Sequence, residues 1–257
     1  MLGSRGADAI SVLLKTNDIS VDVQKHLVSV FVYVSLAAVL AACGAAAGLA
    51  LQLSNIFSLI LGTCGAIGLL FVLLSTERTT ENARLRTGAF FFFAFAEGLS
   101  ITCVVRALIA VSPTLVVQAV AISAAVFMCF TLAALFARRR SYLFLIGTLS
   151  SVMSSLVIVS LVNAFFVRSE RIFDMQLVIG LLLAVGMTAV ETQIIVERAS
   201  TSAEPDVLGD AARLFVDLLE IFIRIAMILL RSKHGDGGSS AGGGGGAALS
   251  TGSRDEL

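Results

Sequence analysis

Tryptophan is absent from this sequence of 257 residues, and tyrosine, proline and histidine occur only twice each. Because Trp and Tyr normally gather at membrane interfaces, any membrane domain here has at most a thin aromatic belt. Cysteine occurs four times, with no CxxC spacing and no Cys/His cluster, which argues against a zinc site and a disulfide framework. We expect the four cysteines to be buried, inert thiols: Cys43, Cys64, Cys103 and Cys129.

Charge is also scarce, since Asp, Glu, Lys and Arg together make up 14% of the chain and cancel to a formal net charge of zero. That balance excludes a strongly basic nucleic-acid-binding protein. Hydrophobic residues make up 57% of the chain, and the mean hydropathy is +0.96. Such a composition is typical of a polytopic membrane protein, whose partners are lipids.

The hydrophobic runs predict an all-α fold with seven transmembrane helices and almost no extramembrane domain. The expected spans are 27–51, 56–75, 88–111, 114–137, 142–166, 173–196 and 213–230. Residues 1–26 are expected to form a cytosolic amphipathic segment without a cleavable signal peptide, and 231–257 a disordered lumenal tail. His26, next to the first span, is expected to be a solvated interfacial residue.

The positive-inside rule gives the orientation. With a cytosolic N-terminus, the cytosolic segments carry eleven Lys and Arg residues, including Arg138, Arg139 and Arg140, against five on the other side. Seven spans then put the C-terminus in the lumen. The chain ends in Arg254, Asp255, Glu256 and Leu257, a sequence that resembles the KDEL and HDEL retrieval signals of the endoplasmic reticulum.

Several local patterns have structural explanations. Gly44 and Gly48 form a GxxxG spacing, which we interpret as close packing within the bundle. The run Phe90–Phe93 is interpreted as lipid-facing bulk. Ser150 and Ser154 are expected to hydrogen-bond back to their own helix.

Charged residues inside the predicted spans require protein or water around them, because lipid penalises charge. Glu97 lies near the middle of the third span, and Glu191 lies five residues before the end of the sixth. The seventh span contains Asp217, Glu220 and Arg224 at helical spacing, so they share one face. A helix with three charges makes a poor lipid-facing span, which places it inside the bundle.

Glu191 and Asp217 lie at similar distances from the loop that joins the last two spans. Antiparallel helices would bring the two carboxyl groups to one depth, where they could share a proton and titrate as a unit. Protonated, they would hold the two helices together; ionised, they would repel each other or bind a cation such as calcium transiently. Glu220 and Arg224 could form an ordinary ion pair within the helix, and Arg224 could alternatively neutralise Glu97.

The segment CFTLAALFARRRSYLFLIG, residues 129–147, resembles the signature region of the Bax inhibitor-1 family, the transmembrane Bax inhibitor motif proteins. ISVLLKTNDISVDVQKHL, VETQIIVERA and LFVDLLEIF are similar to the family's N-terminal segment, sixth-helix ending and last helix. The resemblance covers roughly residues 10 to 230 and is closest to the endoplasmic-reticulum branch.

The resemblance implies seven helices with the last at the centre, a pH-sensitive calcium leak and suppression of cell death. The family's paired acids map onto Glu191 and Asp217, although the family's usual aspartate is a glutamate in VETQ here. A basic residue near the second span can latch this acid in family members. The candidates in this chain are Arg78, Arg84 and Arg86.

The leading hypothesis is therefore a pH-sensitive calcium leak channel of the endoplasmic reticulum, with calcium as the permeant ion, no cofactor, no fixed metal site and no enzymatic activity. The alternative is a non-conducting membrane regulator that acts through cell-death proteins of the Bcl-2 type. An intramembrane aspartyl protease ranks far below both, because that chemistry needs two aspartates and usually a GxGD motif. A proton-coupled transporter lacks support, since no inverted repeat is visible.

Overall fold

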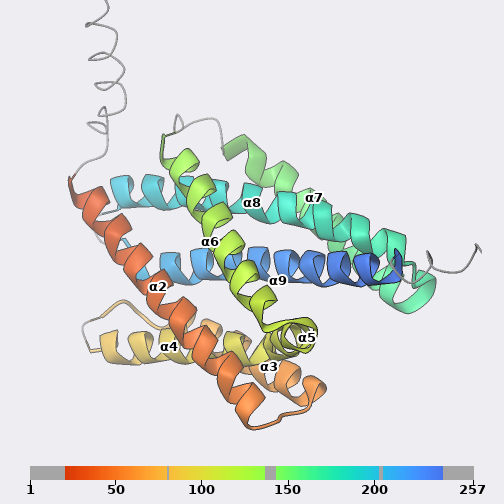
Figure 1. Cartoon of the computed structure of the whole chain (residues 1–257). Helices are drawn as coiled ribbons and strands as arrows, with labels where there is room; N and C mark the ends of the chain where they lie inside the picture. The colour runs from red at the N-terminus through yellow and green to blue at the C-terminus, as the bar shows by residue number, and fades with distance from the viewer. Residues whose placement is uncertain (1–20, 80, 137–142, 203–204, 240–257) are drawn as a thin grey trace, which may run out of the picture.

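A computed structural model describes residues 21–79, 81–136, 143–202 and 205–239, and every regular element within these ranges is a helix (Figure 1). The all-α class is therefore confirmed. The helices are α2 (Val21–Ala50), α3 (Asn55–Ser75), α4 (Ala83–Ser100), α5 (Thr102–Val111), α6 (Pro113–Phe136), α7 (Leu143–Val162), the π-helical turn η2 (Asn163–Val167), α8 (Glu170–Thr201) and α9 (Val207–Ser239). The expected N-terminal amphipathic segment up to residue 20, Arg138–Arg140 and the terminal RDEL sequence lie outside the described residues.

Five helices in the described part of the chain are long and apolar enough to cross a membrane: α2, α3, α6, α7 with its π-turn, and α8. The bent pair α4–α5 raises the number to six if it forms one span. The chain is thus a multi-pass membrane protein. α9 is long enough but is not among these helices, because Asp217, Glu220 and Arg224 fall within its apolar stretch.

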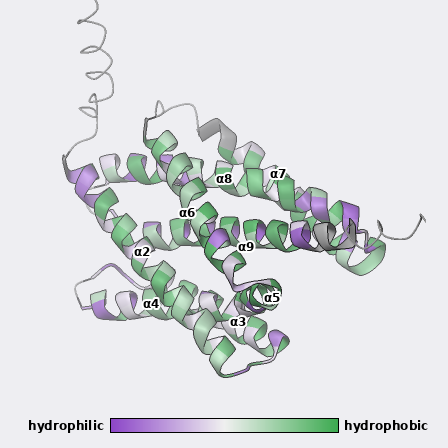
Figure 2. Ribbon diagram, in the orientation of Figure 1, coloured by the Kyte–Doolittle hydropathy of each residue, from purple (hydrophilic) through white to green (hydrophobic). Residues whose placement is uncertain are grey.

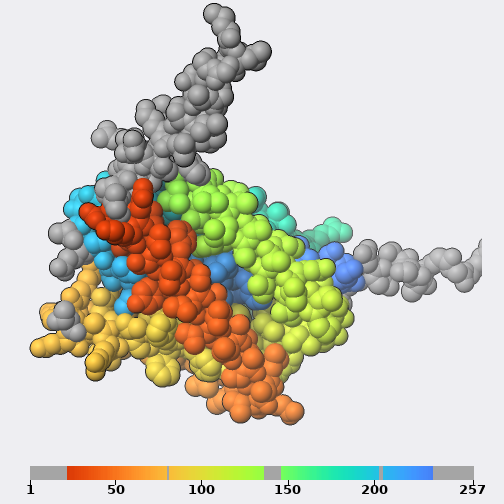
Figure 3. Space-filling view, turned by 60° about the vertical axis from the view of Figure 1, so that its left-hand side comes forward, coloured from red at the N-terminus to blue at the C-terminus, as the bar shows by residue number. Residues whose placement is uncertain are grey.

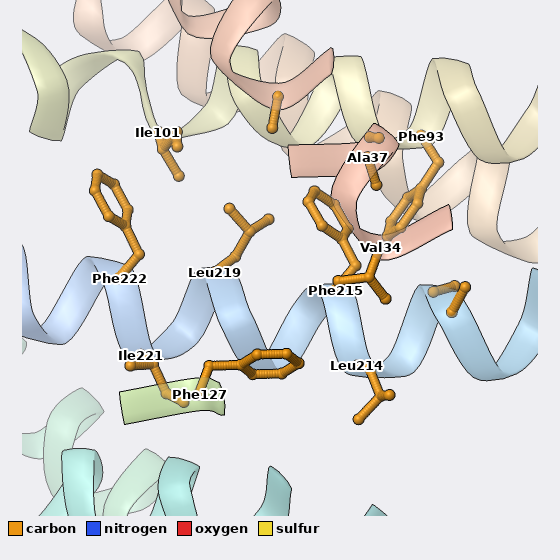
Figure 4. Packing of buried hydrophobic residues seen from close by; sticks show 14 of the residues in the cluster. Val34, Ala37, Phe93, Ile101, Phe127, Leu214, Phe215, Leu219, Ile221 and Phe222 are labelled. Atoms are coloured by element: carbon orange, nitrogen blue, oxygen red, sulfur yellow. The ribbon is translucent and has the colours of Figure 1, made fainter. Parts of the chain in front are cut away.

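The position of α9 follows from its apolar side chains. It packs against α2, α4, α5, α6 and α8. Figure 1 shows α9 running beside α8, with α6 crossing in front of it. Leu214, Phe215 and Ile221 are fully buried and point away from α9 in different directions (Figure 4). Partners in this core include Phe93 of α4 and Phe127 of α6. A helix buried on several sides needs apolar residues all around it, and the few charges on α9 stand out against that background.

The outer surface is apolar. Figure 2 shows hydrophobic residues over most of the helices, with hydrophilic ones gathered mainly towards helix ends and at points along α8 and α9. On the face shown in Figure 3, α2 and α6 cover most of α9. α7 is the least buried of the candidate spans and is held mainly by α8. Exposed apolar side chains on these helices provide the surface that lipid would contact.

α2 and α4 approach each other at glycines. A Cβ added at Gly44 would overlap the Phe95 carbonyl, and one added at Gly98 would overlap the backbone of Ala41. Gly48 faces Thr102 in the same way. The interpretation of the GxxxG spacing as packing within the bundle is confirmed.

The predicted third span is not one straight helix. α4 ends at Ser100 and α5 begins at Thr102, with a bend of 45° between them. At the end of α5, Ser112 leads directly into Pro113, the first residue of α6, where the missing proline N–H costs no hydrogen bond.

Three expectations about side chains were wrong. Phe90 and Phe93 are buried in the core, and of the four phenylalanines Phe92 alone is strongly exposed, because a helix turns consecutive residues to different sides. Cys43, Cys64 and Cys129 are exposed and Cys103 is half-buried, so the thiols are free but lie at the surface. His26 is buried and pairs with Asp210.

Two other expectations concern helix ends and serines. The Ser154 hydroxyl donates to the Ser150 carbonyl at 2.9 Å, as expected. α9 continues to Ser239, so the helix extends beyond Leu230 into the segment predicted to be a flexible tail.

Candidate functional site

The candidate site lies where α8 and α9 run side by side. Thr188 and Glu191 of α8 are one turn apart and lie next to Asp217 of α9, which interacts electrostatically with Glu191. Asp217 is 6% exposed and Glu191 is half-buried. The structure therefore brings together the two acids that the sequence singled out.

Each acid has one oxygen without a partner. Glu191 Oε2 and Asp217 Oδ2 are buried and accept no hydrogen bond from the described residues. Thr188 lies against Asp217, but its hydroxyl donates to the Ala184 carbonyl at 2.9 Å. Because an ionised carboxylate buried without donors is costly, this pair is suited to holding a proton, a water molecule or a cation.

The charges around the pair are unevenly distributed. Arg198 and Arg213 act on Glu191 as positive charges and Asp210 as a negative one, whereas Glu191 and Glu220 both oppose a charge on Asp217. No ion pair in the described part of the chain involves either Glu191 or Asp217. The described residues also contain no group of three or more His, Cys, Asp or Glu that could hold a metal ion. Two carboxyls supply fewer oxygen ligands than calcium usually takes in proteins.

The three arginines proposed as a latch do not pair with Glu191 or Asp217 in this structure. Arg86 Nη2 bonds both carboxylate oxygens of Asp206, at 2.9 and 2.7 Å, and its Nε donates to the Leu73 carbonyl. Arg78 Nε is 3.4 Å from the same carboxylate, while Arg84 is exposed. These bonds join the end of α3 and the start of α4 to the residue preceding α9. We call Arg78, Arg86 and Asp206 the loop clasp.

A second polar contact lies at the same end of the bundle. His26 Nε2 of α2 lies 3.1 Å from Asp210 Oδ2 in the first turn of α9, and both side chains are 4% exposed. Arg198 Nη1 of α8 is 3.3 Å from the other oxygen of Asp210. An acid in the first turn is favoured by the helix dipole, and here it also ties α2 and α8 to α9.

Sequence reasoning missed Asp206, Asp210 and the role of His26. Asp206 directly precedes α9, a position where Asp commonly caps a helix, and that signal was available. Its pairing with Arg86, 120 residues away, and that of His26 with Asp210, 184 residues away, had no local signal.

The other charged residues within the predicted spans make contacts of their own, apart from the acidic pair. Glu220 and Arg224 are an ion pair within α9, as expected for residues four apart. The alternative ion pair between Arg224 and Glu97 is not found among the described residues: Arg224 pairs with Glu220, and Glu97 accepts a hydrogen bond from Ser100 Oγ at 3.3 Å. Arg106 reaches Asn55 and the Leu53 carbonyl near the start of α3.

Comparison with known proteins gives the family. The family described as "Inhibitor of apoptosis-promoting Bax1" matches residues 23–234. The chain belongs to the Bax inhibitor 1 family. The Bax inhibitor 1 of Homo sapiens and that of Sus scrofa are each 36% identical to it over 217 residues, covering 84% of this chain and 90% of theirs. The Bax inhibitor 1 of Arabidopsis thaliana is 36% identical over 214 residues, or 83% of this chain and 84% of its own.

The stretch that matches the Bax inhibitor 1 family includes the acidic pair, the loop clasp and the contact between His26 and Asp210. The family resemblance drawn from the sequence motifs is confirmed over most of the chain. Members are named as inhibitors, which agrees with a regulatory rather than a metabolic protein.

Proposed function

We propose that this chain is a pH-sensitive calcium leak channel of the endoplasmic reticulum membrane that lowers lumenal calcium and thereby suppresses cell death. Membership of a family named for inhibition of Bax supports the link to cell death. In this proposal α9 is the seventh and central span, the N-terminus is cytosolic, and the C-terminal RDEL sequence retains the protein in the endoplasmic reticulum.

One observation carries the proposal: two carboxyl groups from antiparallel helices interact electrostatically inside a membrane protein, and each has an unpartnered buried oxygen. A shared proton would satisfy both oxygens and hold α8 against α9. Loss of that proton would leave two like charges in a region of low dielectric, which favours separation of the helices or entry of a cation. Proton exchange and calcium passage are thereby linked at one place.

The test is calcium flux from loaded vesicles that contain the purified protein, measured across neutral pH. Wild-type flux should change with pH, whereas Asp217→Asn and Glu191→Gln should each flatten the profile because an amide cannot exchange the proton. Glu197→Gln is the matched control, since Glu197 is an exposed acid on the same helix. Unchanged profiles in both site variants would overturn the mechanism.

The same variants separate conduction from cell protection. If protection against cell death follows flux in all of them, the leak accounts for the protection. Protection that survives in any variant whose flux is lost would instead favour a non-conducting regulator that acts through protein partners such as those of the Bcl-2 type.

A further inference from the structure

Buried polar atoms without partners gather along one interface. Five such side-chain atoms occur among the described residues, and four belong to α8 or α9. The four are Gln176 Nε2, Glu191 Oε2, Asp217 Oδ2 and Arg224 Nε.

The α8 residues form one stripe. Gln176, Gly180, Ala184 and Thr188 follow one another at intervals of four, and Glu191 lies one turn further along. Arg224 packs against Gly180, since a Cβ added at Gly180 would lie 2.5 Å from Arg224 Nη1. The absence of a side chain at this position makes room for the guanidinium.

The facing stripe of α9 keeps the same antiparallel register. Asp217 lies against Thr188, Arg224 against Gly180, and Arg231 Nη1 is 2.7 Å from Asp174 Oδ1. Polar side chains therefore recur along this interface from the acidic pair to Asp174, near the start of α8, and Arg231 of α9. We call this interface, bounded by Gln176, Gly180, Glu191, Asp217 and Arg224, the polar seam.

Within a membrane protein such atoms need partners, because neither lipid nor apolar side chains can bond them. Gln176 is 8% exposed and Asp217 is 6% exposed, so bulk water does not reach them directly. Ser160 of α7 satisfies only the Oε1 atom of Gln176, at 3.4 Å. Internal water molecules are the usual partners of buried polar atoms that other side chains leave unsatisfied.

We propose that the polar seam holds a file of water molecules from Glu191 and Asp217 to Gln176, and that the Glu220–Arg224 ion pair sets the charge which a permeating cation meets there. The second half rests on the proposed channel function. The first half does not, because a hydrated seam is a property of the packed helices.

The ion pair has this role because its two charges cancel. Glu220 and Arg224 are partly exposed, with side-chain exposures of 27% and 21%, and Glu220 acts as a negative charge on Asp217 of the polar seam. Removing the arginine leaves one negative charge in the seam, and removing the glutamate leaves one positive charge. A cation should respond to these two changes in opposite directions.

Hydration is tested by thiol labelling in membranes. In a background with all four native cysteines replaced by alanine, Gln176→Cys and Thr188→Cys place thiols in the polar seam. Val178→Cys is the matched control, because Val178 is on the same helix and 54% exposed on its apolar outer surface. A small methanethiosulfonate reagent reacts with the thiolate, which forms only where water reaches the sulfur. Faster labelling of both seam positions than of Val178 is expected, and labelling no faster than at Val178 would overturn the water file.

Charge is tested by calcium flux in three variants. Arg224→Gln should raise flux about tenfold, Glu220→Gln should lower it by about the same factor, and the double variant should return near the wild-type rate. Changes in the same direction in both single variants would indicate a structural role and contradict the inference. If wild-type protein passes no calcium, the proposed function fails, yet the labelling result still decides whether the polar seam is hydrated.

Discussion

Two aspartates near the start of α9 form four ion pairs with side chains of other segments. Asp206 pairs with Arg78 and Arg86, and Asp210 pairs with His26 and Arg198. The acidic pair itself is left without a direct basic partner among the described residues. A basic latch on the acidic pair therefore stays a prediction, and the arginine contacts present in this structure hold the start of α9 instead.

The loop clasp gives a stability prediction. Arg86→Met should lower the free energy of unfolding by about 3 kcal/mol, because Asp206 would keep a largely buried charge without its closest partner. The exposed Arg84→Met should change it by less than about 0.5 kcal/mol. Thermal unfolding in detergent measures both. Adding Asp206→Asn to Arg86→Met should recover part of the loss, and purely additive losses would contradict a direct pairing.

At the scale of whole elements, glycines fix how closely helices approach. Gly98 of α4 meets the backbone of Ala41, whereas Gly88 of the same helix has nothing within 4 Å of an added Cβ. The two positions therefore separate the packing cost of a methyl group from the helix-forming advantage of alanine.

Gly98→Ala should destabilise the bundle by about 1–3 kcal/mol, because α2 and α4 must move apart to admit the methyl group. Gly88→Ala should be neutral or stabilise it by about 0.5–1 kcal/mol. Midpoints of thermal or denaturant unfolding compare the two. Equal effects at both positions would mean that the close contact of α2 with α4 does not hold in the protein.

Sequence patterns predicted helices better than they predicted helix faces. The run of hydrophobic residues located nearly every helix, but it did not separate buried Phe90 and Phe93 from exposed Phe92, since neighbouring helices decide which side is covered. The bend after Ser100 was also not predicted, although Gly98 and Ser100, residue types that often accompany kinks, stand directly before it. α9 was located in the bundle correctly because charge inside an apolar helix excludes contact with lipid.

Over the whole molecule, the acidic pair could be predicted because it depends only on two consecutive antiparallel helices. Contacts between distant segments, such as Arg86 with Asp206, depend on how the first four helices pack against the last two, which no local pattern records. The polar seam combines both kinds of information: its charges are visible in the sequence, whereas its unpartnered atoms require the structure.

The central claim is that Glu191 and Asp217 act as one unit across α8 and α9. Calcium flux against pH for Glu191→Gln, Asp217→Asn and the double variant in loaded vesicles tests it most directly. The account predicts that each single variant flattens the profile and that the double variant is no flatter than either. Two separate, additive losses of pH dependence would contradict it, because the two carboxyls would then be exchanging protons independently.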